Sequence, residues 1–147
     1  MPSEKSLQQQ QYYAHPRNAF WPIIQQLLGV EHPLNYTQKI ELLHQHHIAL
    51  WDVLQSCQRQ GSLDSAIQSS SIQTNDFELF LTQHPFIKAI FFNGAKAEQE
   101  YQRRVLPNLT KNFDTIHYQR LPSSSPAMAT LTPTEKSSAW SSLVDYL

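Results

Sequence analysis

The sequence predicts an α/β layer fold in which helices pack on a small parallel sheet. Amphipathic stretches bounded by helix-cap residues alternate with short apolar runs, the pattern of helices that connect parallel strands. At 147 residues, 40% of them hydrophobic, the chain has the length and apolar content of one compact domain. We therefore expect a single domain over residues 1–147.

Five helices are expected from apolar residues at helical spacing and from the cap residues beside them. Asn18 is a candidate N-cap for the first helix, and Gly29 supplies its C-terminal stop. The third and fifth helices begin with the spacing of a capping box, Asn or Thr followed three residues later by Glu. The expected ranges are 18–28, 37–46, 75–85, 95–106 and 132–144, with a short helical turn at Ser62.

Three apolar runs are expected to form the strands: Ile48–Leu54, Ile87–Phe92 and Thr115–Leu121. Helices separate these runs, so right-handed crossovers and a parallel sheet follow, with ligands at the carboxyl ends of the strands. The polar candidates there are Asp52 to Cys57, Asn93-Gly94 and Pro122 to Pro126, together with the aromatic loop Tyr12 to Asn18.

Composition excludes several classes of protein. No apolar run reaches the roughly 18 residues of a membrane span, and the first residues lack a secretory signal, so we expect a cytoplasmic protein. Cys57 is the single cysteine, which excludes an internal disulfide and any site built on several thiolates. The net charge of −1 leaves nucleic-acid binding open, because local basic patches would be needed for it.

Five spaced motifs carry a resemblance to a known family. They are Tyr12 to Trp21 (YYAHPRNAFW), Ala49 to Leu54 (ALWDVL), Gly61 to Ser65 (GSLDS), Phe91 to Lys96 (FFNGAK) and Leu121 to Ala127 (LPSSSPA). In this order they resemble the DNA-deoxyinosine (hypoxanthine-DNA) glycosylases, a branch of the uracil-DNA glycosylase superfamily. The resemblance implies a three-layer α/β/α fold. It also implies a first strand that is absent here, and puts Met1 where relatives carry a water-positioning acid or amide.

The resemblance assigns roles to individual residues. Tyr13 takes the place of the ring that stacks on a base flipped out of the duplex. Asn18 takes a water-positioning or base-contacting place, Asp52 a base-reading place and Asn93 that of a second amide. The catalytic set is therefore Asn18, Asn93 and Asp52, and the substrate-binding set is Tyr13, His15, Arg17, Ser123, Ser124 and Ser125. Proton abstraction, where it occurs, falls to Asp52 or His15.

Each of these residues also has a structural interpretation. Asn18 is a good N-cap, Tyr13 is suited to a rim aromatic, and Asn93-Gly94 to a turn. Asp52 in an apolar run needs a partner such as Arg59 or Arg17 if it is buried. The Ser/Pro stretch from Pro122 to Thr130 has the composition of a linker.

Two further clusters are ambiguous. His44, His46 and His47 suggest a metal site, but they lack fixed ligand spacing and lie where cations favour a helix C-terminus, so no metal or other cofactor is expected. The basic residues Lys96, Arg103, Arg104 and Lys111 suit a solvated helix face or contacts with phosphates.

The resemblance therefore implies an enzyme that acts on DNA, and no membrane or metal partner is expected. It would hydrolyse the N-glycosidic bond of a deaminated base, with hypoxanthine favoured and uracil and xanthine as the other candidates. The alternative is an N-terminally truncated domain of the same fold that binds damaged DNA but cleaves it weakly or not at all. The oligomeric state is left open.

Overall fold

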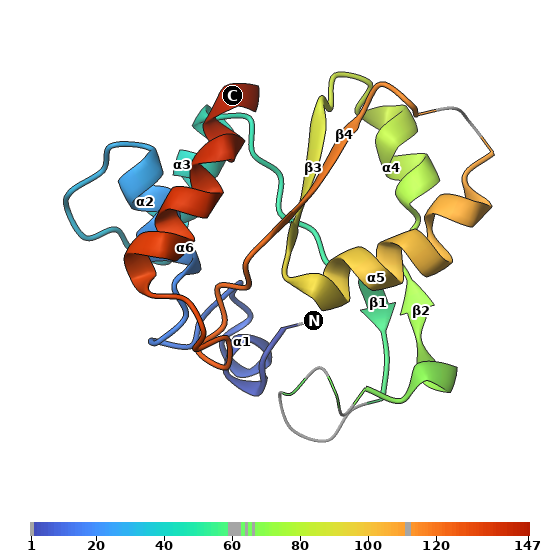
Figure 1. Cartoon of the computed structure of the whole chain (residues 1–147), viewed down its shortest axis with the longest axis horizontal. Coiled ribbons are helices and arrows are strands. Elements are labelled where there is room, and N and C mark those ends of the chain that lie inside the picture. The colour runs from blue at the N-terminus through green and yellow to red at the C-terminus, as the bar shows by residue number, and fades with distance from the viewer. Residues whose placement is uncertain (1, 59–62, 64, 66, 111–112) are drawn as a thin grey trace. The chain divides into compact units, whose positions relative to one another are not determined.

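The computed structural model describes residues 2–58, 63, 65, 67–110 and 113–147. Residue contacts divide the chain into two compact units (Figure 1). We call Asp52–Leu121 the sheet unit, and Pro2–Trp51 with Pro122–Leu147 the helical unit. The single domain expected from the sequence stays a prediction.

The sheet unit contains a parallel pair of strands joined by a helical crossover. Strand β3 (Ala89–Asn93) is followed by α5 (Ala95–Arg104), the short 3-10 helix η3 (Leu106–Asn108) and β4 (His117–Leu121), which pairs with β3. Helix α4 (Phe77–Gln83) precedes β3. The expected α/β class with a small parallel sheet is confirmed, and α4 and α5 fall within their predicted ranges.

The strand expected at Ile48–Leu54 is wrong. Residues 48–53 have no regular structure, and β1 (Leu54–Ser56) pairs antiparallel with β2 (Gln73–Thr74), so the parallel sheet has two strands in the described part of the chain. The boundary between the two units falls after Trp51, which is exposed. The apolar run is therefore a connection between units, and a run that connects units need not be a buried strand.

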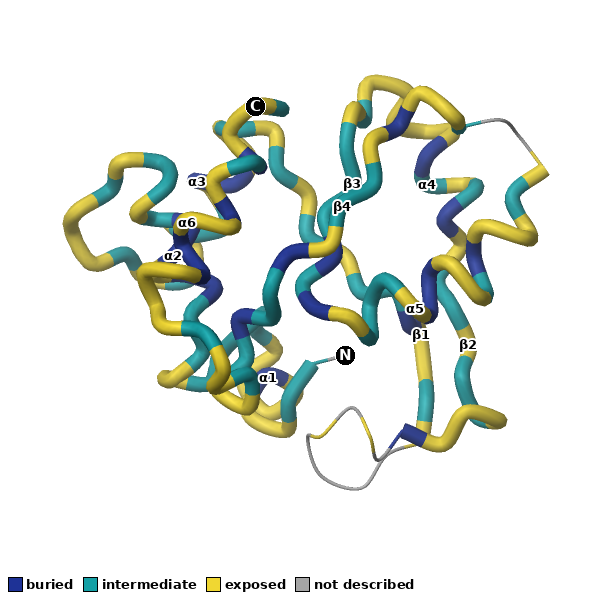
Figure 2. Tube along the Cα trace, in the orientation of Figure 1, coloured by how far each residue is buried: buried dark blue, intermediate teal, exposed yellow. Residues whose placement is uncertain are grey.

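The core of the sheet unit is aromatic. Phe77, Phe92, Tyr101 and Val105 form one buried cluster, with the Phe77 and Tyr101 rings edge to face at 5.0 Å. Buried positions recur along α4 and α5 (Figure 2). The Tyr101 hydroxyl is buried and has no hydrogen-bond partner among the described residues. Packing of apolar surface therefore contributes to the stability of this core.

The helical unit consists of α1 (Glu4–Gln9), α2 (Phe20–Leu27), α3 (Tyr36–Gln45) and α6 (Pro133–Trp140), which continues into η4 (Ser141–Tyr146). The three helices expected in this unit are confirmed. Helix α1 was not expected, because six residues are too few to show a helical period. None of the helices in the described ranges is long and apolar enough to cross a membrane.

Caps explain where several helices begin. Thr132 forms the predicted capping box with Glu135, and Asn35 forms one with Gln38 that was not predicted. The cap expected at Asn75 is wrong, because the adjacent Asp76 caps α4 by accepting from the Leu79 N–H. A short 3-10 helix, η2, covers Ser69–Ser71, and the turn expected at Ser62 lies outside the described residues.

Candidate functional site

The loop between α1 and α2 is fixed by hydrogen bonds from three helices. The Tyr12 N–H donates to the Tyr36 hydroxyl at 3.0 Å, and the Ala14 N–H donates to the hydroxyl of the buried Ser6 at 3.2 Å. The Trp21 indole N–H donates to the Tyr12 carbonyl at 2.9 Å. A loop whose backbone groups are paired in this way keeps one shape without regular secondary structure.

Tyr13 lies in this loop with its ring on an aromatic support. Its ring is stacked on Phe20 at 4.0 Å, and Phe20 in turn meets the Trp140 ring edge to face at 5.7 Å. The backbone of Tyr13 has a φ of 53°, a left-handed conformation that L residues rarely adopt. The surrounding contacts must therefore compensate for this strain, and they hold the ring in one place.

His15 and Arg17 follow in the same loop. The Arg17 N–H donates to His15 Nδ1 at 3.2 Å, and the Asn18 N–H donates to the His15 carbonyl at 2.9 Å. Because Nδ1 accepts a hydrogen bond, a neutral His15 ring carries its proton on Nε2 and donates from there. Arg17 is exposed. The loop thus offers donors of the kind that phosphate oxygens accept.

Asn18 lies at the start of α2. Its Oδ1 accepts from the Phe20 N–H at 3.0 Å, while Ala19 occupies the N-cap position without a side-chain cap. The predicted cap position is therefore wrong by one residue, although the side chain does satisfy an amide of the first turn. Because Oδ1 accepts this bond, the Nδ2 hydrogens are the groups with which the side chain can donate to a ligand.

The serine loop after β4 meets this first loop. The Ala19 N–H donates to the Ser124 carbonyl at 2.9 Å, which joins segments from opposite ends of the chain. Ser124 is fully buried, whereas Ser123 and Ser125 are half-buried. The Ser123 and Ser125 hydroxyl oxygens accept from backbone N–H groups at 3.2 Å, so their protons are available for donation.

Asn93 belongs to the sheet unit, at the carboxyl end of β3. It is half-buried and pairs in register with Leu121, the residue directly before the serine loop. The next residue, Gly94, has a φ of 94° and donates its N–H to the Leu121 carbonyl at 3.0 Å. The turn therefore requires glycine at position 94 and does not by itself account for an asparagine at 93.

Asp52 also belongs to the sheet unit, in the irregular segment before β1. It is half-buried, and its carbonyl accepts from Asn75 Nδ2 at 2.7 Å. Of the two ion-pair partners expected for its carboxylate, Arg59 lies outside the described residues and Arg17 belongs to the helical unit.

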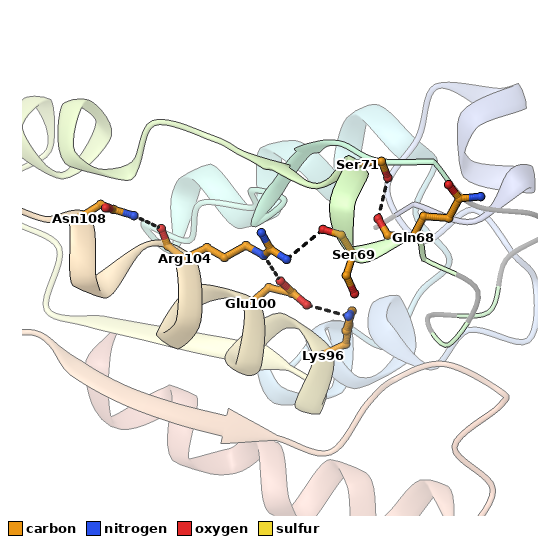
Figure 3. Close-up of polar contacts among 7 residues, drawn as sticks. All are labelled: Gln68, Ser69, Ser71, Lys96, Glu100, Arg104 and Asn108. Carbon is orange, nitrogen blue, oxygen red and sulfur yellow. Dashed lines mark hydrogen bonds and ion pairs between the residues drawn. The ribbon is translucent and has the colours of Figure 1, made fainter.

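The basic residues of α5 have structural partners. Buried Glu100 pairs with Lys96 Nζ at 2.7 Å and with Arg104 Nε at 2.6 Å, and Arg104 also donates to the Ser69 carbonyl (Figure 3). Burial raises the pKa of Glu100, but the hydrogen bonds from both cations outweigh it and hold that pKa below its ordinary value. Lys96 and Arg104 thus form part of the sheet unit's structure.

For Arg103, the structure gives no ion-pair partner among the described residues that would decide between a solvated face and phosphate contacts. Arg103 is exposed, as a solvated helix face requires, and Lys111 lies outside the described residues. Within the described ranges, no three His, Cys, Asp or Glu side chains gather closely enough to hold a metal ion.

Sequence reasoning missed the residues that hold the two loops. Ser6, Tyr36, Lys136 and Trp140 all bond backbone groups of these loops. Their partners lie at least eight residues away in the chain, so no local pattern indicates the pairing. One signal was present: Lys136 lies one helical turn before Trp140, on the apolar face of α6.

The motifs and this geometry agree with comparisons to known proteins. A family model described as uracil DNA glycosylase superfamily matches residues 1–144. The chain belongs to the uracil DNA glycosylase superfamily. A protein named hypoxanthine DNA glycosylase from Methanosarcina acetivorans is 37% identical to it over 117 residues, which cover 74% of this chain and 73% of that protein.

Two further relatives of this superfamily member are informative. A hypoxanthine DNA glycosylase from Methanosarcina barkeri is 34% identical over 98 residues, 66% of this chain but only 61% of that protein. The solution NMR structure of a Methanosarcina acetivorans protein described as a uracil DNA glycosylase matches with a TM-score of 0.73 at 32% identity, covering 97% of this chain and 86% of that one. The family resemblance and the expected fold class are confirmed.

Proposed function

We propose that the protein hydrolyses the N-glycosidic bond of hypoxanthine in DNA. The observation that carries this proposal is the hydrogen bond from the Ala19 N–H to the Ser124 carbonyl. It joins the loop that carries Tyr13 and Asn18 to the serine loop, two segments with base-binding and backbone-binding chemistry. The names of the two curated relatives support hypoxanthine as the base.

The chemistry requires a base outside the duplex. The target nucleotide is flipped into the site and stacks on the supported ring of Tyr13. The bond between the sugar C1′ and the base nitrogen breaks, and the oxygen of a water adds to C1′. The base departs with the bonding electrons and takes up a proton, so donors aimed at it lower the barrier. Asn18 Nδ2 is the donor that we assign to this task.

The DNA backbone requires a different set of donors. His15 Nε2, the Arg17 guanidinium and the hydroxyls of Ser123 and Ser125 have the chemistry to bind phosphates on either side of the flipped nucleotide. Ser124 is fully buried and contributes its carbonyl to the loop instead. Asp52 as the residue that reads the base edge, and Asn93 as a second amide, stay predictions.

The test is base release from matched duplexes. Duplexes with a single hypoxanthine, uracil or xanthine, and an undamaged duplex, are incubated with the protein in excess, and the free base is measured by chromatography. We expect release of hypoxanthine first and none from the undamaged duplex. Tight binding of the hypoxanthine duplex without base release would favour a damage-binding domain. Release of uracil alone would show that hypoxanthine is not the substrate.

A further inference from the structure

Lys136 is a buried cation on the inner face of α6. Its residue is 5% exposed, and its ammonium group donates to the Ser125 carbonyl at 3.3 Å and to the Met128 carbonyl at 2.7 Å. The ion pairs in the described part of the chain do not include Lys136. Two backbone carbonyls of the serine loop therefore take the place of a carboxylate partner.

A lysine at this position costs stability that an apolar residue would not. An ammonium group loses its hydration when it is buried, and a pair of neutral carbonyls compensates for the loss only in part. An apolar side chain at position 136 would pack beside Trp140 without that penalty. The presence of lysine therefore points to a requirement of the loop rather than of the helical core.

The two carbonyls belong to the two ends of one turn. The Met128 N–H donates back to the Ser125 carbonyl at 3.1 Å, so residues 125–128 form a turn with proline at its second position. Lys136 bonds the carbonyls at both ends of this turn, and the Trp140 indole N–H bonds the Pro122 carbonyl at 2.9 Å. Side chains of α6 thus hold three carbonyls of the loop.

These bonds also decide which polar groups the loop offers to a polyanion. The carbonyl oxygens of Ser125 and Met128 bear partial negative charge and are engaged by the ammonium group. Their pairing keeps them from repelling phosphates, while the hydroxyls of Ser123 and Ser125 retain protons to donate. A positive charge beside the turn also attracts an anion.

We propose that Lys136 is a positioning residue that fixes the turn over residues 125–128 for binding of the DNA backbone. This inference rests on the proposed function, and it assigns Lys136 an effect on DNA affinity rather than on bond cleavage. Lys136 does not touch the base or the sugar in this proposal.

The test compares Lys136→Met with Ser137→Ala. Methionine retains much of the lysine stem but removes the charge and both hydrogen bonds. Ser137 is the next residue of α6, is also buried, and donates to Gln26 Oε1 at 2.8 Å, away from the loop. Each variant is melted first, and KM and the single-turnover rate are then measured on a hypoxanthine duplex.

We expect Lys136→Met to raise KM by about tenfold or more, as for the loss of a charge-assisted hydrogen bond, with the single-turnover rate within about twofold of the parent. Ser137→Ala should leave both values unchanged. If Lys136→Met is unfolded at the assay temperature, Lys136→Gln takes its place, because glutamine keeps a donor without the charge, and its KM should still exceed that of Ser137→Ala.

The outcomes separate the two proposals. An active parent together with an unchanged KM in the variant of Lys136 would overturn the positioning role alone. A fall in the single-turnover rate at unchanged KM would overturn it as well. A parent that releases no base from any duplex would overturn the proposed function, and the positioning role with it.

Discussion

Both units of this protein bury apolar side chains, and they differ in the polar contacts that accompany that packing. In the sheet unit, a strand, a helix and a second strand follow in regular order, and four side chains form an aromatic and aliphatic core. In the helical unit, two irregular loops are held by hydrogen bonds from side chains of α1, α3 and α6 to their backbones. In the sheet unit the packing thus accompanies regular strands and a helix, whereas in the helical unit it is combined with polar side chains that hold the two loops.

This difference predicts where stability and function are coupled. A polar side chain that bonds a loop backbone in the helical unit affects both the fold and the groups that the loop presents. A core side chain in the sheet unit affects the fold alone. Substitutions of the same kind in the two units should therefore have different consequences.

The largest contrast is expected between two tyrosines. Tyr13→Leu removes the ring that we assign to stacking on the flipped base, a contact that contributes about 1–3 kcal/mol per base. Leucine, like tyrosine, has a Cβ atom, so the substitution does not relieve the backbone strain at φ 53°. We expect hypoxanthine release to fall by about ten- to a hundredfold.

The control for Tyr13 is Tyr118→Leu in the sheet unit, where Tyr118 packs against the aromatic core. That variant should melt earlier but release hypoxanthine at nearly the parent rate at low temperature. Equal losses of activity in the two variants would remove the stacking role from Tyr13.

A smaller effect is expected from Glu100→Gln, which leaves Lys96 and Arg104 without their carboxylate. We expect a loss of about 2–3 kcal/mol in the free energy of unfolding at neutral pH, since removal of one member of a buried pair costs about 3–5 kcal/mol and both cations are partly exposed. Chemical denaturation at several pH values measures this loss, and base release should not change.

The pH dependence has a definite sign. The pKa of Glu100 is lowered in the folded state, so its stabilisation is present above the ordinary carboxyl pKa and is lost as the pH falls through the folded value. The parent should therefore lose more stability than Glu100→Gln on acidification. Parallel pH profiles of stability for the parent and Glu100→Gln would argue against the ion network.

A more exposed ion pair serves as the control. Glu98→Gln, which breaks the pair with Arg120, should cost about 0–1 kcal/mol in the free energy of unfolding.

The smallest effects come from removing one hydroxyl in each unit. Tyr101→Phe removes a buried hydroxyl that has no partner among the described residues, so stability should stay constant or rise by about 1 kcal/mol. Tyr36→Phe removes the acceptor of the Tyr12 N–H and should cost about 1 kcal/mol. Thermal melts of both variants measure these changes. A shift of the melting temperature in the same direction in both variants would contradict the contrast between the units.

The sequence predicted the elements whose signals are local. Gly29 ends α2 with a φ of 70°, and the Thr132 capping box opens α6 as expected. The run Ile48–Leu54 misled because a buried strand and a connection between units can have the same apolar composition. Helix α1 and strand β2 were missed because they are too short to show a period.

The candidate site was predictable only in part. Family motifs suggested Tyr13, Asn18 and the serine loop as site residues, and the structure joins these segments in the helical unit. It also shows that Ser124 is fully buried, a property that depends on packing and cannot be inferred from three consecutive serines. The support from Lys136 depends on the tertiary fold as well.

The central claim is that Asn18 acts in cleavage and does more than accept a hydrogen bond from the first turn of α2, and a pair of alanine variants tests it most directly. Asn18→Ala and Asn35→Ala each remove a side-chain oxygen that accepts from an N–H at the start of a helix, so each should cost about 1 kcal/mol of stability. Single-turnover release of hypoxanthine should fall by about ten- to a thousandfold in Asn18→Ala, the range for losing one transition-state donor, and stay at the parent rate in Asn35→Ala. Equal rates in the two variants, at equal loss of stability, would show that Asn18 only stabilises the helix and would contradict the account.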